Sequence, residues 1–269
     1  MLTMDVGPLA LGVGHVLLLV SLLLATLVGW WLGRKRQVNP EALIFRLLLA
    51  ALLGARLAFV ALYAGHYRDA PWRVLDIRDG GFIAWGGLLA AALLGGWYLW
   101  RRPELRTALG AGMATGLLVW GMGSLVLHTL ERGTRLPDLA LRDVQGRSVM
   151  LREHLGQPMV INLWATWCPP CRREMPVLAE AQRLYPQVTF MFANQGEGAG
   201  EVRTFLASQA LQLDNVLLDS GGRLGQLVGS RALPTTLFYD AEGRQVGSHL
   251  GELSNASLAR ALETLKTDE

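Results

Sequence analysis

The chain of 269 residues has two cysteines, Cys168 and Cys171, in the segment WATWCPPCRRE. Such a pair could clip a metal ion, anchor a haem, staple the fold or exchange disulfides. A structural zinc site needs four ligands, and no histidine is near the pair in sequence. Covalent haem attachment needs His after the second cysteine, where Arg172 stands instead. A disulfide that closes so small a loop adds little stability. The spacing therefore favours thiol–disulfide chemistry.

The flanking residues predict different roles for the two sulfurs. The apolar run PMVINLWA has strand character, and CRREMPVLAEAQRLY has apolar residues at helical spacing. Cys168 would then lie at or near a helix N-cap, where partial positive charge and free N–H groups stabilise a thiolate. We predict that Cys168 is the attacking nucleophile. Cys171, one turn later, would resolve the mixed disulfide.

Two prolines, Pro169 and Pro170, separate the cysteines. Proline is tolerated in the first helical turn, but it has no N–H to donate to the Cys168 sulfur. We therefore expect moderate stabilisation of the thiolate. The pair should act as a reductant, nearer to thioredoxin than to DsbA on a scale of about −270 to −120 mV.

The amino-terminal half of the chain is apolar and carries the basic charge. Residues 1–130 hold 11 Lys and Arg against 6 Asp and Glu, whereas residues 131–269 hold 14 against 16. This charge lies in loops and not on one basic face, which argues against nucleic-acid binding. Four stretches are long and apolar enough for spanning helices, namely residues 8–33, 42–64, 80–100 and 107–130.

The loops between these stretches predict a topology. RKRQVNPEALIFR and RRPELR are basic, whereas the loop at 65–79 is balanced. The positive-inside rule puts the two basic loops in the cytoplasm. Four crossings would then leave both termini, and the cysteine pair, outside, on the periplasmic or extracellular side. Disulfide exchange has substrates there.

A different pattern follows the short linker at 131–136. Over residues 137–269, short apolar strands alternate with amphipathic helices, which predicts an α/β domain with a central sheet. The predicted fold class is therefore multi-domain. A membrane domain of four transmembrane helices over residues 1–130 precedes an α/β domain.

The motif WATWCPPCRREMP resembles the active site of the TlpA/ResA/CcmG group of membrane-anchored, thioredoxin-like thiol–disulfide oxidoreductases. The resemblance covers residues 135–265 and includes LPTTLFYDAEGRQV and a closing GEL. It implies a thioredoxin-like fold and protein thiol or disulfide substrates. It also implies a redox-active disulfide between Cys168 and Cys171, with no other cofactor and no metal.

The resemblance also points to supporting residues around the pair. Trp167 matches the aromatic residue before the first cysteine. Pro234 matches a cis-proline that places backbone beside the cysteines. Glu197, in FANQGE, resembles an acidic residue that could assist proton transfer to a buried thiol. Arg172 and Arg173 are expected on a solvated helix face.

The membrane half resembles a second family over residues 50–102, the prolipoprotein diacylglyceryl transferases. LLGARLAFVALY and DGGFIAWGGLLAAALLG carry the likeness. However, Trp85 stands at the position of that family's catalytic histidine, and its Arg–Asn–Glu signature is missing. We therefore expect a reused membrane scaffold. Arg56, inside the second stretch, either holds a lipid headgroup phosphate, or it snorkels or pairs with a helix-end carbonyl.

Together these features favour a membrane-anchored periplasmic enzyme that reduces protein disulfides through its dithiol. The predicted spans contain no cysteine, so a separate membrane electron donor, such as a DsbD/CcdA-type protein, would have to reload the pair. The alternatives are a thiol oxidase, a transferase-like or lipid-binding membrane protein with an accessory thioredoxin domain, and a redox-silent binding domain.

Overall fold

The computed structural model describes residues 3–6, 9–34, 38, 40–68, 70–132 and 134–266. The chain forms two compact units, one of residues 14–77 and 81–127, the other of residues 1–13, 78–80 and 128–269. Several residues that the sequence predictions include lie outside the described residues. They include residue 8 at the start of the first predicted span, Lys35, Arg36, Gln37, Asn39 and Asp69 of the predicted loops, residue 133 of the linker and residues 267–269.

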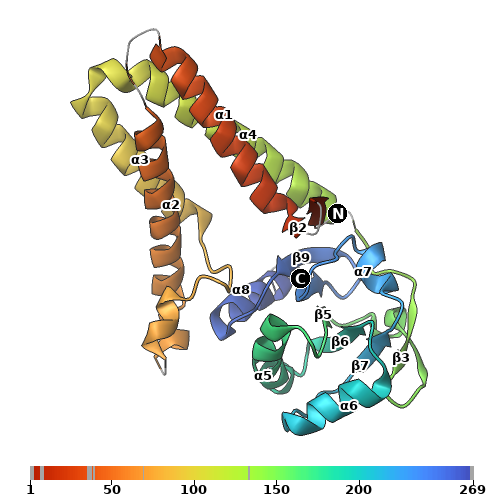
Figure 1. Ribbon diagram of the computed structural model, residues 1–269. Coiled ribbons are helices and arrows are strands. Elements are labelled where there is room, and N and C mark those ends of the chain that lie inside the picture. The colour runs from red at the N-terminus through yellow and green to blue at the C-terminus, as the bar shows by residue number, and fades with distance from the viewer. Residues whose placement is uncertain are drawn as a thin grey trace. The chain divides into compact units, whose positions relative to one another are not determined.

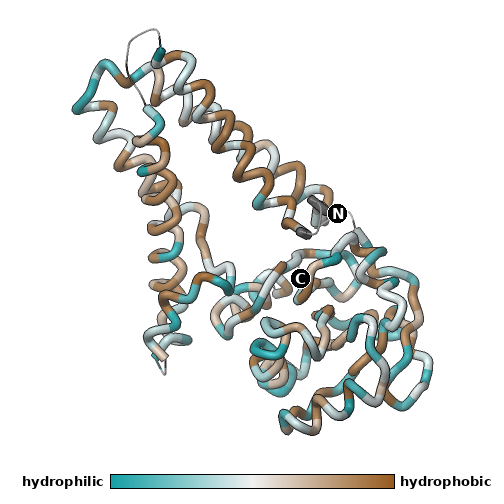
Figure 2. Tube along the Cα trace, in the orientation of Figure 1, coloured by the Kyte–Doolittle hydropathy of each residue, from teal (hydrophilic) through white to brown (hydrophobic). Residues whose placement is uncertain are grey.

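The described part of the first unit is helical. Apolar residues run along its long helices (Figures 1 and 2). Short 3-10 turns lie between some of them. The helices are α1 (Val13–Arg34), α2 (Glu41–Leu62), α3 (Ala84–Arg101) and α4 (Arg106–Arg132), and the turns are η1 (Ala64–Tyr67), η2 (Pro71–Leu75) and η3 (Pro103–Leu105).

Within the described residues, three helical segments are long and apolar enough to cross a membrane: Val13–Arg34, Glu41–Leu62 and Pro103–Leu130. They confirm three of the predicted apolar helices. The third predicted stretch also forms a helix, α3, but its tryptophans, glycines and Arg101 make it less hydrophobic, and it is not among the three. The fourth crossing stays a prediction.

The predicted start of the first span is wrong. Leu9–Gly12 forms a strand, β2, which pairs antiparallel with β1 (Thr3–Val6). The backbone groups of these residues therefore pair across a ladder, and the helix begins at Val13. A short apolar run is compatible with strand and helix alike, so its composition did not separate the two.

Helices α2 and α3 pack closely through small residues. A Cβ added to Gly86 would lie 2.4 Å from Ala58 Cβ, and one added to Gly54 would lie 2.5 Å from Ala90 Cβ. Both separations are too short for a real contact. Small residues of this kind allow the backbones of membrane helices to approach each other.

We predict that Gly86→Ala destabilises the helical unit by about 1–3 kcal/mol, the usual cost of overpacking. Gly96 is a matched control in the same helix, because a Cβ added there meets nothing within 4 Å. Gly96→Ala should be neutral or stabilising, since alanine is the better helix former. The thermal unfolding midpoint in detergent measures both. Equal midpoints for the two variants would contradict the packing argument.

Arg56 is buried in α2, and its partners are backbone carbonyl groups. Its guanidinium donates to the carbonyl oxygens of Val74, Asp76 and Gly81 at 3.0, 2.6 and 3.0 Å. It also lies over the ring of Phe59, 5.5 Å from the ring centroid. The structure thus shows pairing with backbone carbonyls of the connection after α2, which is close to the helix-end carbonyl alternative. Arg56 anchors the segment that joins α2 to α3.

The second unit is built on a seven-stranded sheet in the order β4-β3-β7-β6-β5-β8-β9. The central strands β5, β6 and β7 are parallel, and the outer strands pair antiparallel with their neighbours. The strands are β3 (Ala140–Asp143), β4 (Ser148–Met150), β5 (Met159–Trp164), β6 (Thr189–Gln195), β7 (Val216–Asp219), β8 (Thr235–Tyr239) and β9 (Gln245–Leu250).

Helices cover both faces of this sheet (Figure 1). Along β5, Val160 and Trp164 belong to one buried cluster and Ile161 and Leu163 to the other, as strand alternation requires. Asn162 therefore points to the face that α5 covers. The first cluster contains α5 (Pro169–Leu184), α6 (Ala199–Ser208) and α8 (Asn255–Lys266), and the second contains η4 (Leu151–His154) and α7 (Arg223–Leu227).

The predicted α/β domain with a central sheet is confirmed. The strand and helix patterns around the cysteines also hold, since β5 leads directly to α5. This connection places the cysteine pair at the carboxyl end of a buried central strand. Its position is set by β5 on one side and by the first turn of α5 on the other.

Candidate active site

Cys168 and Cys171 form a disulfide, with the two Sγ atoms 2.10 Å apart. Cys168 is the N-cap of α5, as predicted, and its Sγ accepts the Cys171 N–H at 3.3 Å. Pro169 and Pro170 have no N–H, so Cys171 supplies the first donor of the helix. Cys171 is fully buried and Cys168 is 3% exposed. In the dithiol form, the Cys168 Sγ is the sulfur that would face this N–H as a thiolate.

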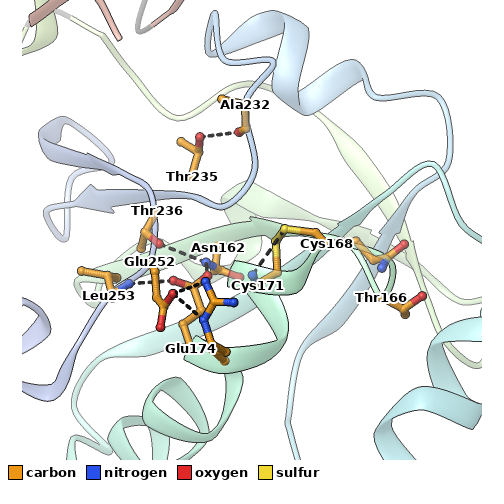
Figure 3. The surroundings of a disulfide bond; sticks show 12 residues. Asn162, Thr166, Cys168, Cys171, Glu174, Ala232, Thr235, Thr236, Glu252 and Leu253 are labelled. Carbon is orange, nitrogen blue, oxygen red and sulfur yellow. Dashed lines mark hydrogen bonds and ion pairs between the residues drawn. A yellow bond between two sulfur atoms is a disulfide. The ribbon is translucent and has the colours of Figure 1, made fainter. Parts of the chain in front are cut away.

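Trp167 and Pro234 come to this site from different elements. Trp167 immediately precedes Cys168, and its side chain is 68% exposed. The Leu233–Pro234 peptide bond is cis, the form that the resemblance implies. Leu233 packs against the buried cluster that contains both cysteines. The Thr235 hydroxyl donates to the Ala232 carbonyl oxygen at 2.7 Å and ties this turn together (Figure 3).

A buried carboxyl group, Glu174, lies one turn after Cys171 on the same side of α5. Its Oε1 accepts a hydrogen bond from Asn162 Nδ2 at 2.8 Å, and its Oε2 accepts the Leu253 N–H at 2.9 Å. Figure 3 shows this group beside the disulfide. Burial raises the pKa of Glu174 to about 8, against the effect of both hydrogen bonds, and the charge of Glu252 adds to the rise.

Asn162 can satisfy either protonation state of Glu174. Its Nδ2 also donates to Thr236 Oγ1 at 3.0 Å, while its Oδ1 has no partner among the described residues. The amide can thus offer N–H to a carboxylate or, after rotation, its oxygen to a carboxylic acid. Asn162 and Thr236 are paired residues of β5 and β8. The sheet therefore holds the partner of Glu174 rigidly.

The sequence analysis did not select Glu174. One signal was present: Glu174 lies three residues after Cys171 and immediately before Met175, on the side of the helix that the apolar spacing marks as buried. An ionisable residue at a buried helix position is rare unless it has partners. Those partners, Asn162 and Leu253, lie 12 and 79 residues away in sequence, so a local pattern does not reveal them.

Glu197 lies between β6 and α6 and contacts the β5–α5 connection. Its carboxylate accepts the Thr166 N–H at 2.7 Å, the Thr166 hydroxyl in a short hydrogen bond and Asn194 Nδ2 at 2.7 Å. Thr166 lies two residues before Cys168, on the other side of the disulfide from Glu174 (Figure 3). Glu197 therefore fixes the approach to the cysteines. Its part in proton transfer stays a prediction.

We predict that Thr166→Val lowers the stability of the second unit by about 1.5–3 kcal/mol, because hydrogen bonds to charged groups contribute this much. Thr204→Val is a matched control, since the Thr204 hydroxyl bonds a carbonyl on the exposed side of α6. That change should cost about 0.5 kcal/mol or less. Thermal unfolding followed by tryptophan fluorescence compares the two variants, and equal losses would contradict the prediction.

Both arginines after the pair have partners on other elements. The Arg172 guanidinium lies over the Phe205 ring at 5.6 Å, and Arg173 pairs with Glu252 at 2.6 Å. The Arg173 side chain is 44% exposed, so its pair with Glu252 is solvent-screened. The helix face is solvated as expected. Arg173 nevertheless binds Glu252, the neighbour of Leu253. The Leu253 N–H in turn donates to Glu174.

Comparisons with known proteins cover both units. The AhpC/TSA family model matches residues 132–245, and the Prolipoprotein diacylglyceryl transferase model matches residues 3–124. Thiol-disulfide oxidoreductase ResA of Geobacillus thermodenitrificans is 30% identical over 136 residues, which are 50% of this chain and 78% of the relative. ResA of Bacillus subtilis is 26% identical over 173 residues, 63% of this chain and 96% of the relative.

Among solved structures, a thiol:disulfide interchange protein from Chlorobium tepidum TLS is 26% identical with a TM-score of 0.43. The match covers 50% of this chain and 94% of that one. With the family model over residues 132–245, the second unit is an AhpC/TSA-type domain with the thioredoxin fold. The chain belongs to the ResA family of thiol–disulfide oxidoreductases. The predicted resemblance is thus confirmed.

The transferase match is confirmed over a longer range than expected, and it supports the assignment of the helical unit as a membrane segment. An apolar cavity of about 430 Å³ lies among its four helices. No ionisable side chain lines it among the described residues. Trp85, at the position of the transferase histidine, is 58% exposed. The oxidoreductase relatives of the second unit do not favour the transferase alternative.

Across the residues that the structure describes, no three His, Cys, Asp or Glu side chains gather in a group that could hold a metal ion.

Proposed function

We propose that the protein is a membrane-anchored thiol–disulfide oxidoreductase that reduces protein disulfides in the bacterial periplasm. One observation carries the proposal: a disulfide lies at the N-cap of α5, with the buried carboxyl group of Glu174 one turn behind the second cysteine. The N-cap stabilises a thiolate on Cys168. The carboxyl group supplies a proton acceptor for Cys171.

The first step starts from the dithiol form. The Cys168 thiolate attacks one sulfur of a substrate disulfide, and the substrate S–S bond breaks as a mixed disulfide with Cys168 forms. The other substrate sulfur leaves as a thiolate and takes a proton from water. The exposed ring of Trp167 lies next to the attacking sulfur in sequence and offers an apolar surface for the substrate chain.

The second step needs a thiolate on Cys171, which is fully buried. We infer that the Glu174 carboxylate accepts the Cys171 proton. Burial raises the pKa of Glu174 to about 8, which makes this carboxylate a stronger proton acceptor than an exposed one and brings its pKa closer to that of an ordinary thiol, about 8.5. The Cys171 thiolate then attacks Cys168 Sγ, the second substrate thiolate leaves, and the Cys168–Cys171 disulfide forms. Two electrons have passed to the substrate.

A further turnover requires a source of two electrons. The chain has two cysteines, Cys168 and Cys171, so no predicted span or loop contains a third one. We therefore propose a separate membrane dithiol protein of the DsbD/CcdA type as the donor. It would attack the Cys168–Cys171 disulfide by the same exchange, run in the opposite direction.

The membrane topology is part of the proposal. We propose that the three candidate spans and α3 all cross the membrane. The positive-inside rule then implies basic loops in the cytoplasm and the second unit in the periplasm. Alkaline phosphatase and green fluorescent protein fused in the 65–79 loop and at the C-terminus test this. Active phosphatase and dark fluorescent protein at both positions support it, and the reverse pattern at either position refutes it.

Insulin reduction by the purified full-length protein in detergent tests the enzymatic proposal. The wild type should accelerate insulin precipitation in the presence of dithiothreitol. Its reduction potential in glutathione buffers should lie nearer about −270 mV than about −120 mV. A potential at the upper end would favour a thiol oxidase. Failure to reduce insulin or any disulfide peptide would favour a redox-silent binding domain.

A further inference from the structure

A short segment between α2 and α3 belongs to the second unit. Residues Arg78–Gly80 are grouped with it, and Asp79 is 6% exposed. Asp79 Oδ2 accepts the hydroxyl of Ser254 at 2.8 Å. Gly80 has φ +61 and lies against His249, where an added Cβ would be 3.0 Å from the ring Cε1. A buried, hydrogen-bonded carboxylate on a connecting segment is uncommon and suggests a specific role.

Ser254 is the residue before α8, at the N-cap position. Its N–H donates to Ser257 Oγ at 2.8 Å, and the Ser257 N–H donates to Ser254 Oγ at 3.2 Å. This reciprocal pair resembles a capping box. The Ser254 hydroxyl still donates to Asp79. Asp79, which lies outside α8, therefore binds the N-cap residue of this helix. A negative charge is also favourable near a helix N-terminus.

The turn before Ser254 leads directly to the disulfide site. Leu253 is 1% exposed, and its N–H is the donor to Glu174 Oε2 at 2.9 Å. On one side of Leu253, Glu252 pairs with Arg173 at 2.6 Å. On the other side, Ser254 donates to Asp79. The donor to Glu174 thus lies between two anchored residues.

The two anchors differ in strength. The Arg173 side chain is 44% exposed, so its ion pair with Glu252 is weakened by solvent. Asp79 and Ser254 form a hydrogen bond at a buried carboxylate, which stabilises more than an exposed pair. The orientation of the Leu253 N–H therefore depends mainly on the Asp79 side of the turn.

We propose that Asp79 is a positioning residue for the disulfide site: by holding Ser254, it fixes the turn whose Leu253 N–H binds the Glu174 carboxylate. The proposal rests on the proposed role of Glu174 as the proton acceptor for Cys171. It gives a segment from between two helices of the membrane unit a direct part in the redox chemistry.

Other charged groups face the same turn. Glu252 and Arg173 flank it, and Arg260 lies close enough to act on His249. Burial lowers the pKa of His249, while its hydrogen bond to the Glu252 carbonyl and the charge of Asp79 oppose that shift. A change at Asp79 could therefore act by charge or by position. Asn keeps an acceptor oxygen without the charge, and Ala removes both.

The test compares full-length Asp79→Ala and Asp79→Asn with wild type in detergent. One readout is hydrogen exchange of the 252–258 amides. The other is the pH profile for resolution of a preformed mixed disulfide on Cys168. We expect Asp79→Ala to speed amide exchange and to move the Glu174 inflection up by at least about half a pH unit, roughly threefold in rate at a fixed pH. Asp79→Asn should retain most of the wild-type behaviour.

Two further variants complete the design. Asp138→Ala removes an exposed carboxylate of the same unit, which pairs with Arg152 at 3.3 Å, and should change neither readout. In a Ser254→Ala background, Asp79→Ala should add nothing, because its partner is already missing. An additive effect there, or equal shifts in Asp79→Asn and Asp79→Ala, would overturn positioning through Ser254.

The outcomes separate this proposal from the proposed function. If Glu174→Gln abolishes the pH inflection but Asp79→Ala leaves exchange and profile unchanged, Asp79 has no positioning role and the reductase mechanism stands. If wild type reduces no disulfide at all, the proposed function fails. The exchange of the Leu253 amide in Asp79→Ala then still reports whether Asp79 holds the turn.

Discussion

Replacing Cys171 by alanine is expected to stop the reaction at the mixed disulfide, whereas replacing Cys168 by serine is expected to abolish it. Cys168 accepts the Cys171 N–H at the N-cap, so it is the sulfur that the helix stabilises as a thiolate. Cys171 is fully buried and is poorly placed to meet a protein substrate. The two variants should therefore fail at different steps.

Non-reducing gels and mass spectrometry of cells that express each variant measure this difference. Cys171→Ala should carry covalent partners through Cys168, and dithiothreitol should release them. Cys168→Ser should carry none and should reduce insulin no faster than dithiothreitol alone, since the chain has two cysteines. If Cys168→Ser carried as many covalent partners on Cys171 as Cys171→Ala carries on Cys168, the assigned roles would be wrong.

The local features of the site were predictable from the sequence. The N-cap position of Cys168 follows from a strand pattern before it, prolines after it and helical spacing beyond. The strands around it were also predicted, because β5 and β6 are short apolar runs bounded by turn residues. These features depend on neighbours in sequence, and the relevant energies are local.

The features that were missed depend on contacts between distant residues. Glu174 becomes part of the site through Asn162 on β5 and Leu253 before α8. Asp79 and Ser254 are 175 residues apart. No periodicity joins such pairs, and one sequence contains no record of their proximity. The predicted span at residues 80–100 forms a helix, α3, but it is not among the three candidate spans, so this crossing stays a prediction.

Glu174→Gln is expected to slow the second step by about 10²-fold, at the lower end of what general acid–base groups contribute. Glutamine keeps the shape and one acceptor oxygen, but its NH2 group is a donor and cannot accept the second of the two hydrogen bonds. It also cannot accept the Cys171 proton. The rate of the wild type should rise with pH towards about 8, the pKa of Glu174, as the carboxylate forms. In the variant this inflection should disappear, and hydroxide dependence alone should remain.

Glu197→Gln is the matched control for the pH profile. The Glu197 carboxylate is bound by Thr166 and Asn194, so we expect its loss to lower stability and to leave the inflection near pH 8 in place. Stopped-flow release of a fluorescent thiol from a mixed disulfide on Cys168 resolves the step. Loss of the inflection in Glu197→Gln, with retention in Glu174→Gln, would assign proton transfer to Glu197.

The same substitution should change how stability depends on pH. The pKa of Glu174 is raised from 4.5 to about 8 by burial, so between these values the folded chain binds more protons than the unfolded chain. Stability then falls as pH rises through this window and levels off above it. Below about pH 4.5 both states are protonated, so the slope vanishes and the contribution to stability is fully present. Glu174→Gln should therefore flatten the decline of Tm from pH 5 to 8, while Glu197→Gln should preserve it. An unchanged slope in Glu174→Gln would show that Glu174 does not hold its proton in the folded protein, and the proton-transfer step would need a different acceptor.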